Sequence, residues 1–152
     1  MIYISHRGNL NGINKNIENL PEYLEKIIPL YPNIIFEIDM WLIDEKLWLG
    51  HDFNQYVINN DFLNKYKERI ICHAKNIDCL EYLIQRGDIH CFFHNNDDVV
   101  LTSKNWLWTF PGKKLTSKSI CVLPEWNDFK ENTDNILGIC SDYILDIYNK
   151  NR

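Results

Sequence analysis

Residues 34–39 read Ile-Ile-Phe-Glu-Ile-Asp, a short apolar run that ends in two carboxylates. Side chains two residues apart point to the same face of a strand, so Glu37 and Asp39 can both reach one hard cation. Similar short apolar runs lead to His6 in Ile-Ser-His-Arg-Gly (residues 4–8) and to His51 in Leu-Gly-His-Asp (residues 49–52). We expect buried strands to deliver all of these polar groups to one rim of a sheet or barrel.

These residue types together indicate chemistry on a phosphate ester. Two imidazoles, His6 and His51, can serve as general acid and general base. Arg7 beside the first histidine favours an anionic ligand, because a guanidinium binds phosphate oxygens in a fork. With a cation on Glu37 and Asp39, the set is typical of a metal-assisted phosphodiester enzyme.

Length and charge limit the classes of function. The chain has 152 residues, 45% of them hydrophobic, which is enough for one domain with a real core. Its formal net charge of −5 and lack of a basic block argue against binding nucleic acid. No apolar segment approaches the roughly 20 residues of a membrane span. The chain starts directly into Ile-Tyr-Ile without a cleavable leader pattern, so we expect a cytoplasmic protein.

The five cysteines are odd in number and widely spaced, and none form a CxxC pair. Most lie in apolar runs, where free cysteine behaves as a small buried hydrophobe. We therefore expect reduced core thiols, with Cys72, next to His73, as the one candidate for a catalytic thiol.

Apolar periodicity and turn residues predict the elements in order. Strands are expected at 2–5, 34–38, 70–73, 89–94, 99–102, 106–110, 119–123 and 138–143, a hairpin at 40–43 with 47–49, and helices at about 20–28, 60–66 and 77–85. The alternation of strand and helix favours an α/β protein with a largely parallel sheet. Because the expected helices vanish after residue 94, we predict a trimmed or incomplete TIM-like (β/α) barrel with few helices in its C-terminal half.

The ordered motifs over residues 4–52 resemble those of the glycerophosphodiester phosphodiesterases, a family of the phosphatidylinositol-phospholipase-C-like superfamily. The likeness runs through His-Arg-Gly at 6–8, Glu-Asn at 18–19, Glu-Ile-Asp at 37–39, Asp44 and His-Asp at 51–52. A looser echo is Cys-Ser-Asp-Tyr at 140–143. The resemblance implies that residues 1–152 form a single domain of this type.

The resemblance also implies a role for each matching residue. His6 and His51 would be the acid/base pair, and Glu37 and Asp39 would hold a divalent cation, Mg²⁺ or Ca²⁺. Arg7 and Lys75 would contact the substrate phosphate. Asn19 and Asp52 would orient the histidines and the loop behind this set.

Two departures from the family pattern affect these expectations. The family's third strand carries Glu-x-Lys, whereas here the strand reads His73-Ala74-Lys75. Imidazole suits Mn²⁺ or Zn²⁺ better than Mg²⁺ or Ca²⁺, so either the metal changes, or Glu125 or Asp142 supplies the missing oxygen, or the metal binds weakly. Barrels of this type also run to about 250 residues, with about 200 as a floor, so this one must be trimmed or completed by a partner chain.

The leading hypothesis is a metal-dependent phosphodiesterase acting on a small glycerophosphodiester-like or sugar/polyol phosphodiester. The alternatives are a non-catalytic phosphate or sugar-phosphate binding module and a sphingomyelinase-D-like phosphodiester lyase. Trp106, Trp108 and Phe110 alternate along one strand, so all three rings share a face that serves either core packing or a sugar platform. Missing helices would leave apolar strand faces uncovered, and a homodimer is one way in which they could be covered.

Overall fold

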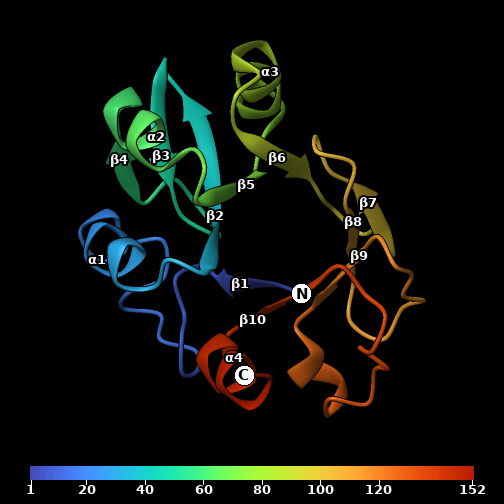
Figure 1. Ribbon diagram of the computed structural model, residues 1–152. Helices are drawn as coiled ribbons and strands as arrows, with labels where there is room; N and C mark the ends of the chain where they lie inside the picture. The colour runs from blue at the N-terminus through green and yellow to red at the C-terminus, as the bar shows by residue number, and fades with distance from the viewer.

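The computed structural model describes residues 1–152 as one curled ten-stranded sheet with four α-helices (Figure 1). The strands are β1 (Ile2–His6), β2 (Ile34–Ile43), β3 (Lys46–Leu49), β4 (Tyr56–Ile58), β5 (Ile70–Ala74), β6 (His90–Phe93), β7 (Val99–Leu101), β8 (Leu107–Thr109), β9 (Ser119–Val122) and β10 (Gly138–Ser141). The α-helices are α1 (Pro21–Ile27), α2 (Asn60–Tyr66), α3 (Ile77–Arg86) and α4 (Ile144–Lys150), and short 3₁₀ turns cover Ile28–Leu30 and Pro124–Asn127.

The sheet is mostly parallel and curls on itself. Parallel pairings give the order β6–β5–β2–β1–β10–β9–β8, while β3, β4 and β7 are antiparallel additions. Figure 1 shows these strands around a common centre, with β6 beside the β7–β8 hairpin. The structure is therefore a mixed α/β fold compatible with a partial barrel.

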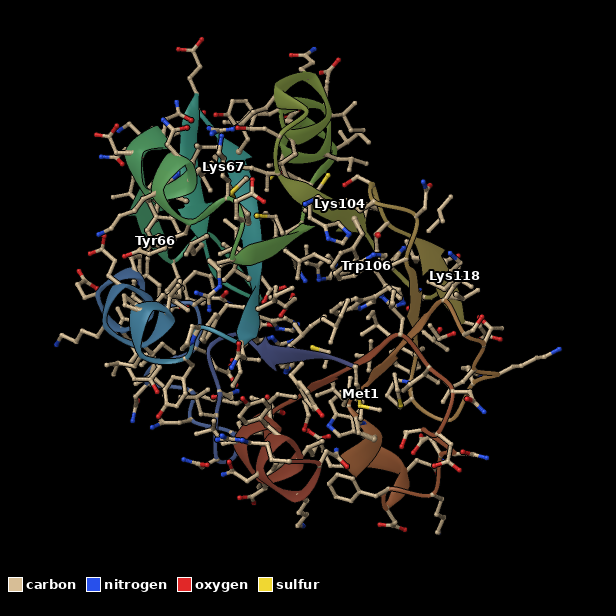
Figure 2. All side chains as sticks on the ribbon, in the orientation of Figure 1. Met1, Tyr66, Lys67, Lys104, Trp106 and Lys118 are labelled. Atoms are coloured by element: carbon tan, nitrogen blue, oxygen red, sulfur yellow. The ribbon has the colours of Figure 1, made fainter.

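Strand alternation sends one set of side chains into the ring and the other outward. An inner cluster of buried residues includes Ile4, Ile71, Phe92, Trp108 and Ile120. Side chains from the surrounding strands project into the centre, which the ribbon leaves open (Figure 2). The larger outer cluster joins the helices to the back of the sheet, so the carboxyl-end rim is left for polar groups.

An aromatic ladder, rather than strand pairing, connects β6 with β8. Its rungs are His90–Trp106, Phe92–Trp108 and His94–Phe110, with ring centroids 4.4, 4.5 and 5.6 Å apart. Trp106, Trp108 and Phe110 thus share one face, as predicted, and it is the inner face of the sheet. The rungs His90–Trp106 and Phe92–Trp108 are core packing. Ser103 adds polar links, because its N–H donates to the Cys91 carbonyl oxygen and its hydroxyl accepts from the Cys91 N–H, both at 2.9 Å.

Most predicted elements are found within one or two residues of their expected ends, with three differences. The strand at 34–38 and the first arm of the hairpin form one continuous strand, β2, and β4 was not expected. The expectation that helices vanish after residue 94 is wrong at the C-terminus, where α4 packs against β1 and β10. This helix buries Ile144, and its two turns give too short a periodic signal to recognise.

The five cysteines are all free and buried, as expected for core thiols. Burial raises the pKa of the Cys72 thiol well above its usual value, which argues against the alternative of a catalytic thiol at this position. No helix in the structure combines the length and apolar character needed to cross a membrane.

Candidate metal and phosphate site

The predicted metal carboxylates lie at the carboxyl-end rim of the parallel strands. Register places His6 of β1 beside Glu37 of β2, and Asp39 of β2 beside His73 of β5. Because parallel strands all end at the same rim, residues distant in the sequence meet there. Lys75 follows β5 directly, and its backbone N–H donates to the Met40 carbonyl oxygen at 2.8 Å.

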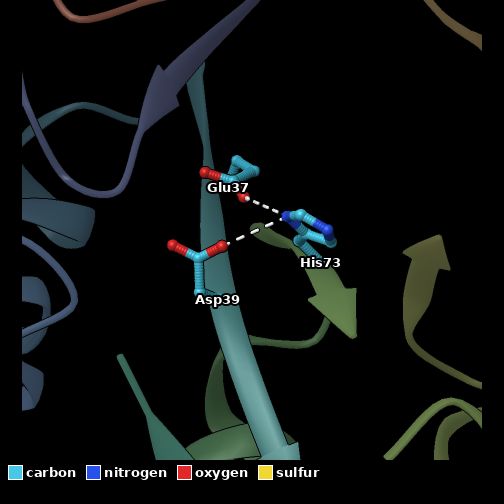
Figure 3. Close-up of side chains that lie close together, drawn as sticks. All are labelled: Glu37, Asp39 and His73. Atoms are coloured by element: carbon cyan, nitrogen blue, oxygen red, sulfur yellow. Dashed lines mark ion pairs between the residues drawn. The ribbon is translucent and has the colours of Figure 1, made fainter. Parts of the chain in front are cut away.

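Glu37, Asp39 and His73 form a compact group in which one ligand atom from each lies within 4.8 Å of the others (Figure 3). His73 Nδ1 is 3.2 Å from Asp39 Oδ1 and 3.9 Å from Glu37 Oε1. Glu37 and Asp39 are buried and His73 is partly buried, so the group is shielded from bulk water.

The chemistry of this group fits a divalent cation. Asp39 Oδ1 is buried and has no hydrogen bond of good geometry, although His73 Nδ1 lies 3.2 Å away, and a buried carboxylate oxygen normally accepts at least one such bond. Two carboxylate oxygens and one imidazole nitrogen would leave the remaining coordination positions open for water or substrate, as in catalytic metal sites. The donor set is mixed, so it suits first-row transition metals as well as harder cations.

Two cationic side chains surround the same aspartate. Arg7 Nε lies 3.1 Å from Asp39 Oδ2, and Lys75 Nζ lies 3.7 Å from Asp39 Oδ1. Burial opposes ionisation of Asp39, but His73, Arg7 and Lys75 outweigh it, so the pKa of Asp39 is held below its usual range. Burial and the neighbouring Asp39 instead raise the pKa of Glu37.

His6 belongs to a separate buried network on the β1 side of the rim. Its Nδ1 lies 2.8 Å from Asp142 Oδ1, and Asn9 Nδ2 donates to the same oxygen at 2.8 Å. Asn9 Nδ2 also donates to Glu18 Oε1 at 2.9 Å, which ties the loop after β1 to this network. Burial alone would lower the pKa of His6, but Asp142 and the charge of Glu37 raise it above its ordinary value. The imidazole is thereby held with its Nδ1 hydrogen-bonded to Asp142 and its Nε2 available for another partner.

Asn19 contacts Asp39 directly, whereas the resemblance implies that it orients the histidines and the loop. Its Nδ2 donates to Asp39 Oδ2 and its Oδ1 accepts from the Asp39 N–H, both at 2.9 Å. The Asn19 backbone is in the left-handed region (φ +57°) and its N–H donates to the Arg7 carbonyl oxygen. One side chain therefore fixes both the backbone and the carboxylate of Asp39.

His51 lies on the loop after β3, apart from the buried group. The loop is anchored because Gly50 N–H donates to the Asp39 carbonyl oxygen at 3.1 Å and Trp41 Nε1 donates to the Gly50 carbonyl oxygen at 2.7 Å. Gly50 has φ +150°, and a Cβ there would lie 2.1 Å from the Phe53 carbonyl oxygen, so only glycine permits this path. Burial, with the charge of Arg7, lowers the pKa of His51.

A cavity of about 200 Å³ connects His51 with the phosphate-binding candidate Arg7. Glu18 and Asn19 also line it. The guanidinium of Arg7 uses one edge for Asp39 and lies 3.7 Å from Glu18, so its other N–H groups remain available to an anion. Asp52 binds His51 Nδ1 at 2.8 Å, which agrees in position with an orienting role, although its carboxylate is exposed.

The structure does not place the other two oxygen candidates, Glu125 and Asp142, next to the Glu37, Asp39 and His73 group. Glu125 accepts from the Ser141 hydroxyl and from the Asp142 N–H, both at 2.9 Å, and thereby caps the end of β10. The Asp142 carboxylate is occupied by His6 and Asn9. Of the three candidate third ligands, His73, Glu125 and Asp142, only His73 lies beside Glu37 and Asp39.

Sequence reasoning did not identify two groups at this rim. Asn9 is fully buried and bridges Asp142 with Glu18, yet it looked like one more polar residue of an Asn- and Gly-rich loop. The backbone carbonyl of His94 lies 3.2 Å from His73 Nε2, and a backbone group leaves no signal in a sequence.

No protein-family model matches this chain, and no curated protein or solved structure shows significant similarity to it.

Proposed function

We propose that the protein is a metal-dependent phosphodiesterase on a trimmed TIM-like barrel, cleaving a small phosphodiester with a glycerol, sugar or other polyol on one side. The observation that carries the proposal is the convergence of Glu37, Asp39 and His73 beside two cationic side chains, Arg7 and Lys75. A cation site next to a guanidinium and an ammonium is suited to a phosphate ester. The motif resemblance over residues 4–52 supports the same reaction class.

In this proposal His6 is the general acid and His51 the general base. His6 is buried against Asp142, which stabilises an imidazolium and orients its free nitrogen. His51 is more exposed and lines the cavity that Arg7 shares, where an attacking hydroxyl or water can reach it. Environments that move two histidine pKa values apart, upward for His6 and downward for His51, suit this division of roles.

A bound divalent cation would neutralise charge that builds on the phosphoryl oxygens. Glu37, Asp39 and His73 would hold it, and Asn19 would keep the Asp39 carboxylate in place. Arg7 and Lys75 would then be released from Asp39 to bind the phosphate, because the cation replaces their charge. Phe110 and Trp126, both exposed with rings 6.4 Å apart, offer a surface for the alcohol group.

One observation favours a second candidate, a phosphate-binding module without catalysis. Arg7 and Lys75 already lie close to Asp39, so the charge of this carboxylate is balanced without a metal. In such a module the same two cations would bind a phosphate ester that is released unchanged.

An assay of purified protein separates these functions. Glycerophosphodiesters and a chromogenic phosphodiester are incubated with Mg²⁺, Ca²⁺, Mn²⁺ or Zn²⁺, and products are analysed by phosphorus NMR. We expect metal-dependent cleavage that falls at least about a hundredfold in His6→Ala and in His51→Ala. Asp39→Asn should also abolish cleavage, whereas the matched control Glu45→Gln, an exposed acid on the adjoining turn, should not.

Cleavage that survives both histidine substitutions would refute the acid/base assignment. Binding of the esters with no cleavage under any metal would establish the module instead. A cyclic phosphate product would identify a lyase of the sphingomyelinase-D-like kind, and an open monoester a hydrolase.

A further inference from the structure

The ring of His73 is fixed in one orientation by its surroundings. It stacks on Phe92 with centroids 4.8 Å apart and an interplanar angle of 15°, and Phe92 in turn stacks on Trp108. On its outer side, His73 Nε2 lies 3.2 Å from the His94 carbonyl oxygen. A carbonyl oxygen can only accept, so Nε2 carries a proton.

The other ring nitrogen then faces two carboxylates. Nδ1 lies 3.2 Å from Asp39 Oδ1 and 3.9 Å from Glu37 Oε1. In a neutral ring with its proton on Nε2, Nδ1 is a lone pair, and a lone pair directed at two acceptors is repelled. A positive species, either an extra proton or a metal cation, has to lie between them.

We infer that Glu37, Asp39 and His73 bind a first-row transition metal, of the Mn²⁺ or Zn²⁺ class, in preference to Mg²⁺ or Ca²⁺, and that His73 Nδ1 is the nitrogen ligand. The part that this metal would play in catalysis rests on the proposed function, whereas the choice of metal and ligand rests on the geometry of the three side chains alone. Imidazole suits Zn²⁺ well and is also accepted by Mn²⁺, whereas Mg²⁺ and Ca²⁺ prefer an all-oxygen set.

The outer contacts of His73 strengthen the assignment. A histidine ligand usually donates its second N–H to a carboxylate or a backbone carbonyl, which fixes the ring and the tautomer. His73 has this arrangement through the His94 carbonyl. Asp39 Oδ1, the carboxylate oxygen closest to Nδ1, is also the buried oxygen that no hydrogen bond satisfies.

The competing account places a proton on Nδ1 instead of a metal. Lys75 Nζ, 3.7 Å from Asp39 Oδ1, would contribute the remaining positive charge. That arrangement needs no metal ion, so the two accounts differ in whether a cation binds and in which cation is preferred.

Metal-free full-length protein is titrated with MnCl₂, ZnCl₂, MgCl₂ and CaCl₂ in an isothermal calorimeter, and the Mn²⁺ complex is studied by pulsed EPR. We expect Mn²⁺ and Zn²⁺ to bind at least about tenfold more tightly than Mg²⁺ and Ca²⁺. The EPR spectrum should show nitrogen coupling from one imidazole.

Two variants locate the ligand. His73→Glu restores an all-carboxylate set, so it should lose the nitrogen coupling and shift the preference toward Mg²⁺ and Ca²⁺. The control His94→Gln removes the neighbouring imidazole but keeps the backbone carbonyl, and should retain both the coupling and the metal preference. Thermal melting of each variant shows whether it is folded.

Tighter binding of Mg²⁺ or Ca²⁺, absence of nitrogen coupling, or no binding of any cation would each overturn the inference, the last in favour of a proton on Nδ1. Nitrogen coupling that disappears in His94→Gln and persists in His73→Glu would identify His94 as the ligand and would also overturn the inference. Binding as expected with no ester cleaved would refute the proposed function and leave the metal assignment standing.

Discussion

Replacing Asn19 tests how the candidate site holds its central carboxylate. The side chain is buried and makes two hydrogen bonds to one residue, from Nδ2 to Asp39 Oδ2 and from the Asp39 N–H to Oδ1. Its backbone lies in the left-handed region at φ +57°, which glycine and asparagine adopt more readily than alanine. Asn19→Gly therefore removes the hydrogen bonds without straining the backbone, while Asn19→Ala removes them and also imposes backbone strain.

The expected cost follows from these contacts. A hydrogen bond to a charged group contributes about 1.5–3 kcal/mol and an ordinary one about 0.5–1.5 kcal/mol, so Asn19→Gly should lower the free energy of unfolding by about 2–4.5 kcal/mol. The left-handed conformation costs alanine about 1–2 kcal/mol, partly offset by the larger unfolded-state entropy of glycine. Asn19→Ala should thus be about 1 kcal/mol less stable than Asn19→Gly.

Urea denaturation followed by tryptophan fluorescence measures both variants, using the five native tryptophans. Asn16→Ala is a matched control, because Asn16 is exposed in the same loop and should change stability by less than about 0.5 kcal/mol. An Asn19→Gly protein within about 0.5 kcal/mol of the wild type would refute the reasoning. Equal stability of the glycine and alanine variants would refute the strain component alone.

Three further predictions concern the interior. Burial lowers the pKa of His90 to about 4, so the unfolded state binds a proton first as the pH falls. Stability should then decrease between about pH 6.5 and 4, by at most ~3 kcal/mol, and urea titrations of His90→Gln should show a flatter pH dependence than the wild type. Phe92→Ala should cost about 3–5 kcal/mol of unfolding free energy and Phe92→Leu distinctly less, since leucine retains most of the packing against Trp108; equal costs would contradict the stacking account. Because burial raises the pKa of Cys72 well above normal, its alkylation by iodoacetamide at pH 8, followed by mass spectrometry, should occur only after unfolding, and rapid labelling of native protein would contradict this.

Local patterns in the sequence predict much of this fold for identifiable reasons. The helix expected at residues 77–85 is found at Ile77–Arg86, where Asn76 caps the start and Gly87, at φ +76°, ends it. Such caps and the hydrophobic periods are properties of neighbouring residues. The connection between β6 and β8 is not a property of neighbouring residues, because it depends on which aromatic rings meet after the sheet has curled.

In the candidate site too, local spacing was predictable from the sequence, whereas contacts between distant strands were not. The i, i+2 spacing of Glu37 and Asp39 was sufficient to predict a shared face, and both are found at one rim. The partner of His6 is Asp142, which is 136 positions away and reaches it only because β1 pairs with β10. Without that pairing, Asp142 could be considered only as one oxygen donor among several.

The aromatic contacts between β6 and β8 also orient the proposed metal ligand. His73 stacks on Phe92, and Phe92 forms the middle rung of the ladder between β6 and β8. The upper rung, His94–Phe110, fixes the segment whose carbonyl oxygen accepts from His73 Nε2. Since a chain of this length has few outer helices to brace its strands, aromatic side chains brace them from within. Loosening the middle rung, as in Phe92→Ala, should therefore weaken metal binding as well as stability, because Phe92 is the ring that packs against His73.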